Sequence, residues 1–281
     1  MTRAVTASHV DRHQVSRGLG GKNHLRAKDL SGGTGLPVRS GQHIGTRVVW
    51  IDIARTAAIV CMIVFHFTRD LETFGLVPQG TTLVGGWYVF ARLIAASFLF
   101  LVGISLVLAH GDGIRWRSFW KRLAMIGGAA TVVTFATYLA QPDRFIYFGI
   151  LHAIAASSVI AVLFVNLPAL FPAACALGVW SVAFWWGRSL DLPVWLGWTG
   201  LGQAVRPSLD LLPLFPWLAC SLLGVSVARM SRSFMVPRAV RSDGTRALLS
   251  WPGRNSLAIY LLHQPVLLAL IWLAAWAGIF A

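Results

Sequence analysis

Residues 86–109 read GWYVFARLIAASFLFLVGISLVLA, an apolar run whose only formal charge is on Arg92. A helix of about 20 apolar residues spans the ~30 Å hydrocarbon core of a bilayer. Runs of the same character, separated by glycine, proline and polar residues, occupy residues 50–69, 118–140, 145–166, 169–187, 209–229 and 254–279. The sequence therefore predicts an all-α, polytopic transmembrane bundle of about seven helices.

The composition excludes other classes of protein. Apolar residues make up 56% of the chain and charged residues only 12%, about half the share that is usual in a soluble domain. The net charge is +14. The Lys and Arg residues lie between the apolar runs and in the first fifty residues rather than along one face, which argues against nucleic acid as a partner. Cys61, Cys175 and Cys220 lie inside apolar runs without the spacing of a metal site, so we expect no metal.

The basic residues predict an orientation, because cytoplasmic loops carry an excess of Lys and Arg. The tail carries Arg39 and Arg47 near the first span. The loop between the second and third spans carries Arg115, Arg117, Lys121 and Arg122, and the loop between the sixth and seventh carries Arg229, Arg232, Arg238, Arg241, Arg246 and Arg254. We expect the N-terminus in the cytoplasm and the C-terminus outside. Most of these arginines, Arg122 included, are explained by topology alone.

Residues 1–47 are rich in Gly, Ser, Arg and His and have no hydrophobic periodicity. Such a segment cannot bury enough apolar surface to offset the entropy of ordering it. We expect a disordered basic cytoplasmic tail, followed by a transmembrane domain over residues 48–281.

Four ionisable residues of the first span share one helical face. Asp52, Arg55, His66 and Asp70 fall within roughly 60° on a helical wheel, and about 16 Å of axial rise separates Arg55 from His66. Asp52 and Arg55 are compatible with an interfacial ion pair or with part of a polar path. A carboxylate one turn from His66 can fix the imidazole tautomer and raise its basicity, as a general base requires.

Other polar residues in the spans have two interpretations each. His152 and His263, the latter on a stripe with Tyr260, are either hydrogen-bonded packing residues or cavity-lining residues. Arg254 and Asn255 begin the last span, and a helix N-terminus beside an arginine can bind phosphate.

The loop 188–208 carries Trp195 and Trp198 among several glycines. It is either a short interfacial helix with an aromatic belt or a lid whose tryptophans stack on a sugar.

The segment 47–70, RVVWIDIARTAAIVCMIVFHFTRD, resembles the opening helix of bacterial membrane proteins grouped with the catalytic domain of heparan-α-glucosaminide N-acetyltransferase. Its Arg55 and His66 have the separation shared by the broader transmembrane acyltransferases. Thr56 departs from the pattern, since many relatives have glycine there. Further segments that look like this family are FLFLVGISL (98–106), YFGILHAI (147–154), PLFPWLACSLLG (213–224) and PGRNSLAIYLLHQPVL (252–267), so that the resemblance covers roughly residues 47–280.

The resemblance implies a multi-pass enzyme of the bacterial inner (plasma) membrane. It would move an acetyl group from cytoplasmic acetyl-CoA, its co-substrate, to a sugar or glycan acceptor on the outer face. His66 would be catalytic, as general base or transient acyl carrier, and Asp70 would orient it. The residues implied to hold CoA are Arg55, Arg254 and Asn255, and those implied to line the same cavity are Asp52, His152, Tyr260 and His263.

Two other classes fit the same residues. A transporter or flippase for a polar or lipid-linked solute could use a buried Asp–Arg–His proton relay, although the sequence has no internal repeat and no matched pair of interrupted helices. A non-catalytic partner of a cell-envelope complex is the other. Nothing in the sequence indicates an oligomeric state.

Overall fold

The computed structural model describes residues 49–231 and 244–279, which lie in one compact unit. The tail expected at 1–47 and the loop residues Arg232, Arg238 and Arg241 lie outside the described residues. Within these ranges every regular element is helical, which confirms the predicted all-α helical bundle.

The helices follow the predicted spans closely. In chain order they are α1 (Val49–Thr73), η1 (Thr81–Leu83), α2 (Gly85–His110), α3 (Trp116–Ala140), α4 (Ile150–Ala161), η2 (Val162–Phe164), α5 (Leu170–Trp186), η3 (Val194–Thr199), α6 (Leu214–Met230), α7 (Gly244–Arg254) and α8 (Ser256–Trp276).

The lengths and surfaces of these helices suit a membrane. α1, α2, α3 and α8 are long and apolar enough to cross a bilayer, and the stretch Ile150–Phe164, α5 and α6 are shorter apolar helices. Large apolar side chains face outward on α3, α5 and α8, with Leu139 67%, Phe184 72% and Trp276 77% exposed. Surfaces of this kind are stable against lipid and not against water.

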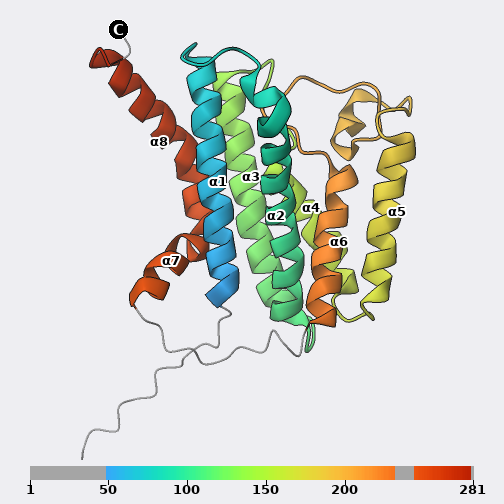
Figure 1. Ribbon diagram of the computed structural model, residues 1–281. Coiled ribbons are helices and arrows are strands. Elements are labelled where there is room, and N and C mark those ends of the chain that lie inside the picture. The colour runs from blue at the N-terminus through green and yellow to red at the C-terminus, as the bar shows by residue number, and fades with distance from the viewer. Residues whose placement is uncertain (1–48, 232–243, 280–281) are drawn as a thin grey trace, which may run out of the picture. The chain divides into compact units, whose positions relative to one another are not determined.

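The helices pack side by side in a bundle (Figure 1). α8 and α2 both pack against α1, while α6 lies between α2 and α5 and also contacts α4. α1 and α3 begin at the end of the bundle where α7 lies, and η3 lies at the opposite end. We call these the α7 end and the η3 end.

The tightest crossing joins α2 and α6. A Cβ on Gly103 would lie 2.0 Å from the Ser221 carbonyl oxygen, and one on Gly224 would lie 2.2 Å from the Phe100 carbonyl oxygen. The two backbones therefore touch directly, as small residues allow at membrane helix interfaces. This crossing fixes α2, which carries Ser105 to the candidate site.

Two helices begin later than the sequence indicates. α4 begins at Ile150 rather than near 145, and α6 at Leu214 rather than near 209. The segments before them pair with each other instead: Leu209 N–H donates to the Arg144 carbonyl at 2.7 Å, and Leu212 N–H to the Phe148 carbonyl at 3.0 Å. Pairing between distant segments leaves no signal in hydrophobic periodicity.

The apolar pattern of the sequence does not predict α7. The predicted last span begins at residue 254, whereas Pro252 and Gly253 lie in the last turn of α7, and Asn255 separates α7 from α8. α7 is short and packs along α1. Its Leu248 and Trp251 side chains are 75% and 59% exposed.

Candidate functional site

Near the α7 end, one carboxylate holds two arginines. The buried Asp52 accepts a hydrogen bond from Arg55 Nη1 at 3.0 Å and pairs with Arg254 Nε at 3.6 Å. Arg55 Nη2 also donates to Ser105 Oγ at 2.6 Å. We call Asp52, Arg55 and Arg254 the arginine cluster. Two cations share one anion, and both guanidinium groups keep accessible surface, so the cluster can receive an anionic group.

Thr56 and Gly253 place Arg254 in this cluster. A Cβ on Gly253 would lie 1.9 Å from the Asp52 carbonyl oxygen, so only glycine lets α7 approach α1 this closely. Gly253 N–H donates to Thr56 Oγ1 at 2.9 Å, and Thr56 Oγ1 donates to the Leu249 carbonyl at 2.8 Å. The Thr56 hydroxyl thus bridges Gly253 N–H and the Leu249 carbonyl, the two groups that a direct backbone hydrogen bond would join in a regular helix. The residue that departs from the family pattern therefore makes the packing tight.

Asn255 lies apart from this arrangement. Its side-chain amide donates to the Trp251 carbonyl at 2.9 Å, which caps the end of α7. Of the two residues expected to form a phosphate site at the start of the last span, only Arg254 belongs to the arginine cluster.

Polar residues of α1 and α8 meet nearer the η3 end. The His66 and His263 rings meet edge to face with centroids 4.9 Å apart, and Gln264 Nε2 donates to Asp70 Oδ1 at 2.6 Å. We call His66, Asp70, His263 and Gln264 the histidine cluster. The family resemblance implies that Asp70 orients His66. In the structure Gln264 takes one carboxylate oxygen and the other has no partner, so no hydrogen bond joins Asp70 to His66.

The tautomer of His263 follows from its contacts. His263 Nδ1 lies 2.6 Å from the Tyr260 carbonyl oxygen, which can only accept a hydrogen bond. Nδ1 therefore carries the proton, and Nε2 presents a lone pair. Nε2 is buried and has no partner. His263 thus offers a basic nitrogen toward the interior, beside the His66 ring.

Unsatisfied polar atoms concentrate in the histidine cluster. Among the described residues, four buried side-chain atoms lack a hydrogen-bond partner, and three are Asp70 Oδ2, His263 Nε2 and Gln264 Oε1. The fourth is Ser157 Oγ on α4. Native proteins leave few such atoms without a partner, and a bound ligand or water commonly completes them. The histidine cluster is therefore the strongest candidate for a substrate site.

His152, in contrast, is satisfied at both ring nitrogens. Its Nδ1 accepts from Gly149 N–H at 3.3 Å, so the proton of the neutral ring is on Nε2, 3.3 Å from Thr134 Oγ1. This histidine ties the start of α4 to α3. Of its two interpretations, the structure favours the packing residue.

Asp210 is a further candidate, which the sequence pattern does not single out. It lies in the loop before α6, accepts a hydrogen bond from Ile150 N–H, and is close enough to Tyr260 for its charge to act on the phenol. Burial raises the pKa of Asp210 above its ordinary value. The Tyr260 ring centroid is 5.4 Å from that of His263, so Tyr260 connects Asp210 to the histidine cluster. The available signal was a carboxylate inside the apolar run predicted at residues 209–229.

The polar stripe of α1 is not continuous. Ile59 and Met62 lie on the same helical face between Arg55 and His66, and they are 2% and 4% exposed. They pack with Ile94, and Ile259 and Tyr260 lie against this group. This apolar layer separates the arginine cluster from the histidine cluster, so the four ionisable residues that share one face of α1 do not form an unbroken polar path.

The loop at the η3 end is partly helical, as one interpretation of it expected. Its Trp195 is 72% exposed, whereas the Trp198 ring lies 5.3 Å from that of Phe148. Trp198 therefore packs onto the segment before α4, and only Trp195 is free to face a ligand or the membrane surface.

The described residues contain no group of three or more His, Cys, Asp or Glu side chains that could hold a metal ion. Comparison with known proteins found no match among curated proteins and none among solved structures. A family model described as "Heparan-alpha-glucosaminide N-acetyltransferase, catalytic" matches residues 47–265, which include both clusters. The chain therefore belongs to the family of the heparan-α-glucosaminide N-acetyltransferase catalytic domain.

Proposed function

We propose that this membrane protein transfers an acetyl group from acetyl-CoA to the amine or hydroxyl of a sugar or glycan. The family supports an acyltransferase of the membrane. The observation that carries the proposal is the His66–His263 pair, whose cluster holds three of the four unsatisfied buried side-chain atoms of the described residues. An acceptor nucleophile has to be deprotonated as it attacks, and a buried imidazole with a free lone pair is suited to that step.

The donor would bind from the α7 end. The arginine cluster carries two guanidinium groups and one carboxylate, and its net charge of +1 suits the phosphates of CoA. Arg55 is held by both Asp52 and Ser105, so its guanidinium is already oriented before a phosphate arrives. The charge of the loops supports the α7 end as the cytoplasmic one, because Arg115, Arg117 and Arg229 lie at that end.

The chemistry at the histidine cluster takes one of two balanced forms. In the first, an imidazole removes the acceptor proton while the acceptor attacks the thioester carbonyl. In the second, His66 itself attacks the carbonyl and passes the acetyl group to the acceptor. In both, the carbon–sulfur bond breaks and CoA leaves as the thiol with one proton. Asp70 and Gln264 would position the acceptor through their unpartnered oxygens.

The apolar layer of Ile59 and Met62 has to move for the thioester to reach His66 from the α7 end. Such a layer also keeps water and protons from crossing between the clusters when no substrate is bound. A closed layer between two polar clusters is equally what a transporter would have. That observation favours the transporter as the second candidate.

One experiment separates the two candidates. Purified protein in lipid nanodiscs is incubated with radiolabelled acetyl-CoA, with and without glucosamine, the sugar in the family's name. The acyltransferase account expects saturable CoA binding, slow acetyl-CoA hydrolysis and label on glucosamine or on a related sugar of a small panel. The absence of both CoA binding and acetyl-CoA hydrolysis would overturn the account and favour the transporter.

A further inference from the structure

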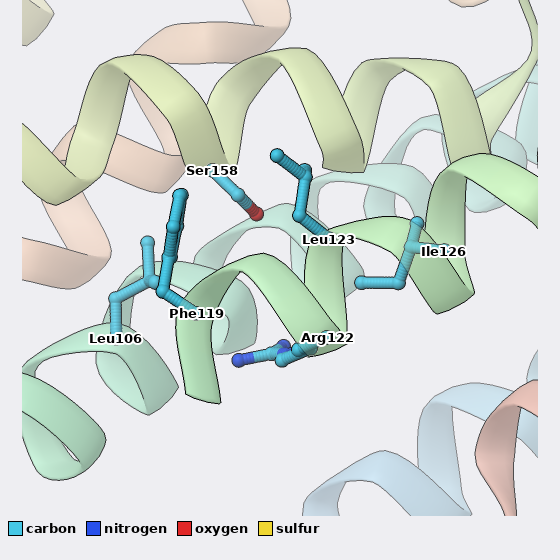
Figure 2. Close-up of a pocket in the computed structure, with 6 residues that line it drawn as sticks. All are labelled: Leu106, Phe119, Arg122, Leu123, Ile126 and Ser158. Carbon is cyan, nitrogen blue, oxygen red and sulfur yellow. The ribbon is translucent and has the colours of Figure 1, made fainter. Parts of the chain in front are cut away.

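Arg122 has an environment that topology does not explain. It lies on α3, six residues after Trp116, and its side chain is partly buried. The neighbouring Lys121 and the preceding Arg117 are exposed, as residues at a membrane interface should be. Arg122 instead faces the interior beside a small cavity lined by Leu106, Phe119, Leu123, Ile126 and Ser158 (Figure 2).

Among the described residues, the Arg122 guanidinium has no anionic partner. The ion pairs of the described residues near the α7 end join Asp52 with Arg55 and Arg254, and no hydrogen bond from Arg122 to another described residue occurs. The other lining residues are apolar except Ser158, whose hydroxyl donates to the Ile154 carbonyl at 2.6 Å. In Figure 2 the guanidinium lies apart from this hydroxyl. A charge in an apolar setting without a partner is costly, so it indicates a function.

Arg122 and Arg55 both lie in the half of the bundle nearer the α7 end. Each is six residues into its helix, about 9 Å along the axis, and α1 and α3 begin at the same end of the bundle. Arg122 is close enough to Arg55 for the two positive charges to interact. Adding Arg122 to the arginine cluster gives three guanidinium groups for one carboxylate, a net charge of +2.

We propose that Arg122 and Arg55 together bind a phosphate or diphosphate group in the half of the bundle nearer the α7 end. Arginine is suited to this because its planar fork donates two parallel hydrogen bonds to phosphate oxygens. The cavity beside Arg122 has a volume of about 10 Å³, far below the usual ~300–1,000 Å³ of a small-molecule site. It has room for about one water molecule, so the phosphate group would have to contact Arg122 from outside this cavity.

This inference rests on the proposed function only for the identity of the ligand, where it assigns Arg122 to a phosphate of CoA. The phosphate site can be tested without turnover. The probe is sodium pyrophosphate, titrated at constant ionic strength into protein in phosphatidylcholine nanodiscs, with thermal stability as the readout. A parallel arm adds phosphatidylglycerol to protein in neutral detergent, which distinguishes a lipid phosphate from a soluble one.

The variants are Arg122→Met and Arg122→Gln, with Lys121→Gln as the matched control that removes the same charge from an exposed position. We expect pyrophosphate to stabilise the unaltered protein and Lys121→Gln alike. Both Arg122 variants should fold, with ligand-free melting temperatures equal to or above that of the unaltered protein because an unpaired charge is gone. Their affinity for pyrophosphate should fall about 10-fold or more. An Arg122-dependent response to phosphatidylglycerol alone would support the site and assign it to lipid.

Three outcomes would overturn the inference: an unaltered response to phosphate in both Arg122 variants, no response in the unaltered protein to either probe, or failure of both variants to fold. The result for CoA itself separates this inference from the proposed function. Pyrophosphate binding through Arg122 without CoA binding would sustain the site and remove the acetyl-CoA assignment. Unchanged CoA binding and acetyl transfer in Arg122→Met would remove the Arg122 site and sustain the acetyl-CoA assignment.

Discussion

His66 of α1 and His263 of α8 meet edge to face, with ring centroids 4.9 Å apart. His263 is held by the Tyr260 carbonyl at its Nδ1, so its Nε2 lone pair is free beside the His66 ring. The packing of α8 on α1 brings together two imidazoles from opposite ends of the described chain. This pair is the centre of the proposed chemistry.

His263→Ala should lower kcat for acetyl transfer by ~10² or more, because proton transfer by a positioned imidazole typically contributes that much. CoA binding should change little, since His263 lies away from the arginine cluster. The matched control is His152→Ala, which leaves Gly149 N–H without its acceptor and removes the His152 contact of the Thr134 hydroxyl. This variant should lower the free energy of unfolding by about 1–3 kcal/mol and leave kcat of the folded protein nearly unchanged. A larger loss of kcat in His152→Ala than in His263→Ala would contradict the assignment.

Thr56→Val should destabilise the docking of α7 on α1. The valine keeps the shape but removes the hydroxyl that bridges Leu249 and Gly253, at a cost of about 1–3 kcal/mol. Arg254 should then leave Asp52, and CoA affinity should fall. Thr56→Ser should behave like the unaltered protein. Thr68→Val is the control, because the Thr68 hydroxyl bonds only the Val64 carbonyl of its own helix. Equal melting temperatures and CoA affinities for Thr56→Val and Thr68→Val would refute the bridging role.

Asp210→Asn should stabilise the protein increasingly as pH rises. Burial raises the pKa of Asp210 above its ordinary value of 3.8, so the folded protein holds this proton more tightly than the unfolded chain does. Asp210 therefore destabilises the fold as pH increases above 3.8. Asparagine keeps an oxygen for Ile150 N–H and has no charge to bury. Melting temperatures at pH 4 to 8 check this, with the exposed Asp191→Asn as control. A difference between Asp210→Asn and unaltered protein that shrinks with rising pH would have the wrong sign.

The orientation can be tested by reporters of sidedness. A reporter fused after Ala281 should lie outside the cytoplasm, and one inserted near Arg238 should lie within it, because the basic loops favour the cytoplasm. If both reporters lie on the same side of the membrane, the predicted orientation is wrong, and so is the proposal that the donor binds from the cytoplasm.

The sequence predicted the helices well and their contacts poorly. Spans such as 86–109 and 118–140 agree with α2 and α3 to within two residues, because long apolar runs have one stable form in a bilayer. Local neighbours were predictable as well: the Asp52–Arg55 pair forms at 3.0 Å. Contacts between helices were not, since helical periodicity contains no register between elements. Gln264 therefore appears as the partner of Asp70 only in the structure.

Arg122 illustrates the same limit. In the sequence it resembles Lys121 and Arg117, basic residues at the start of a span, and the positive-inside rule accounts for all three. Only the packing of α3 against its neighbours distinguishes the inward arginine from the outward lysine. Asp210 was missed for a related reason, because its pairing segment lies before α4, far away in the chain.

His66→Ala tests the central claim most directly. The measurement compares this variant with the unaltered protein in lipid nanodiscs for acetyl transfer from radiolabelled acetyl-CoA to glucosamine, and measures CoA binding on the same preparations. The account predicts that transfer falls by at least ~10² while CoA affinity and thermal stability change little, because general-base or nucleophilic catalysis is lost and the arginine cluster is intact. Transfer close to that of the unaltered protein would contradict the account. So would a loss of transfer matched by an equal loss of CoA binding, since His66 would then act in donor binding or folding rather than in the chemistry.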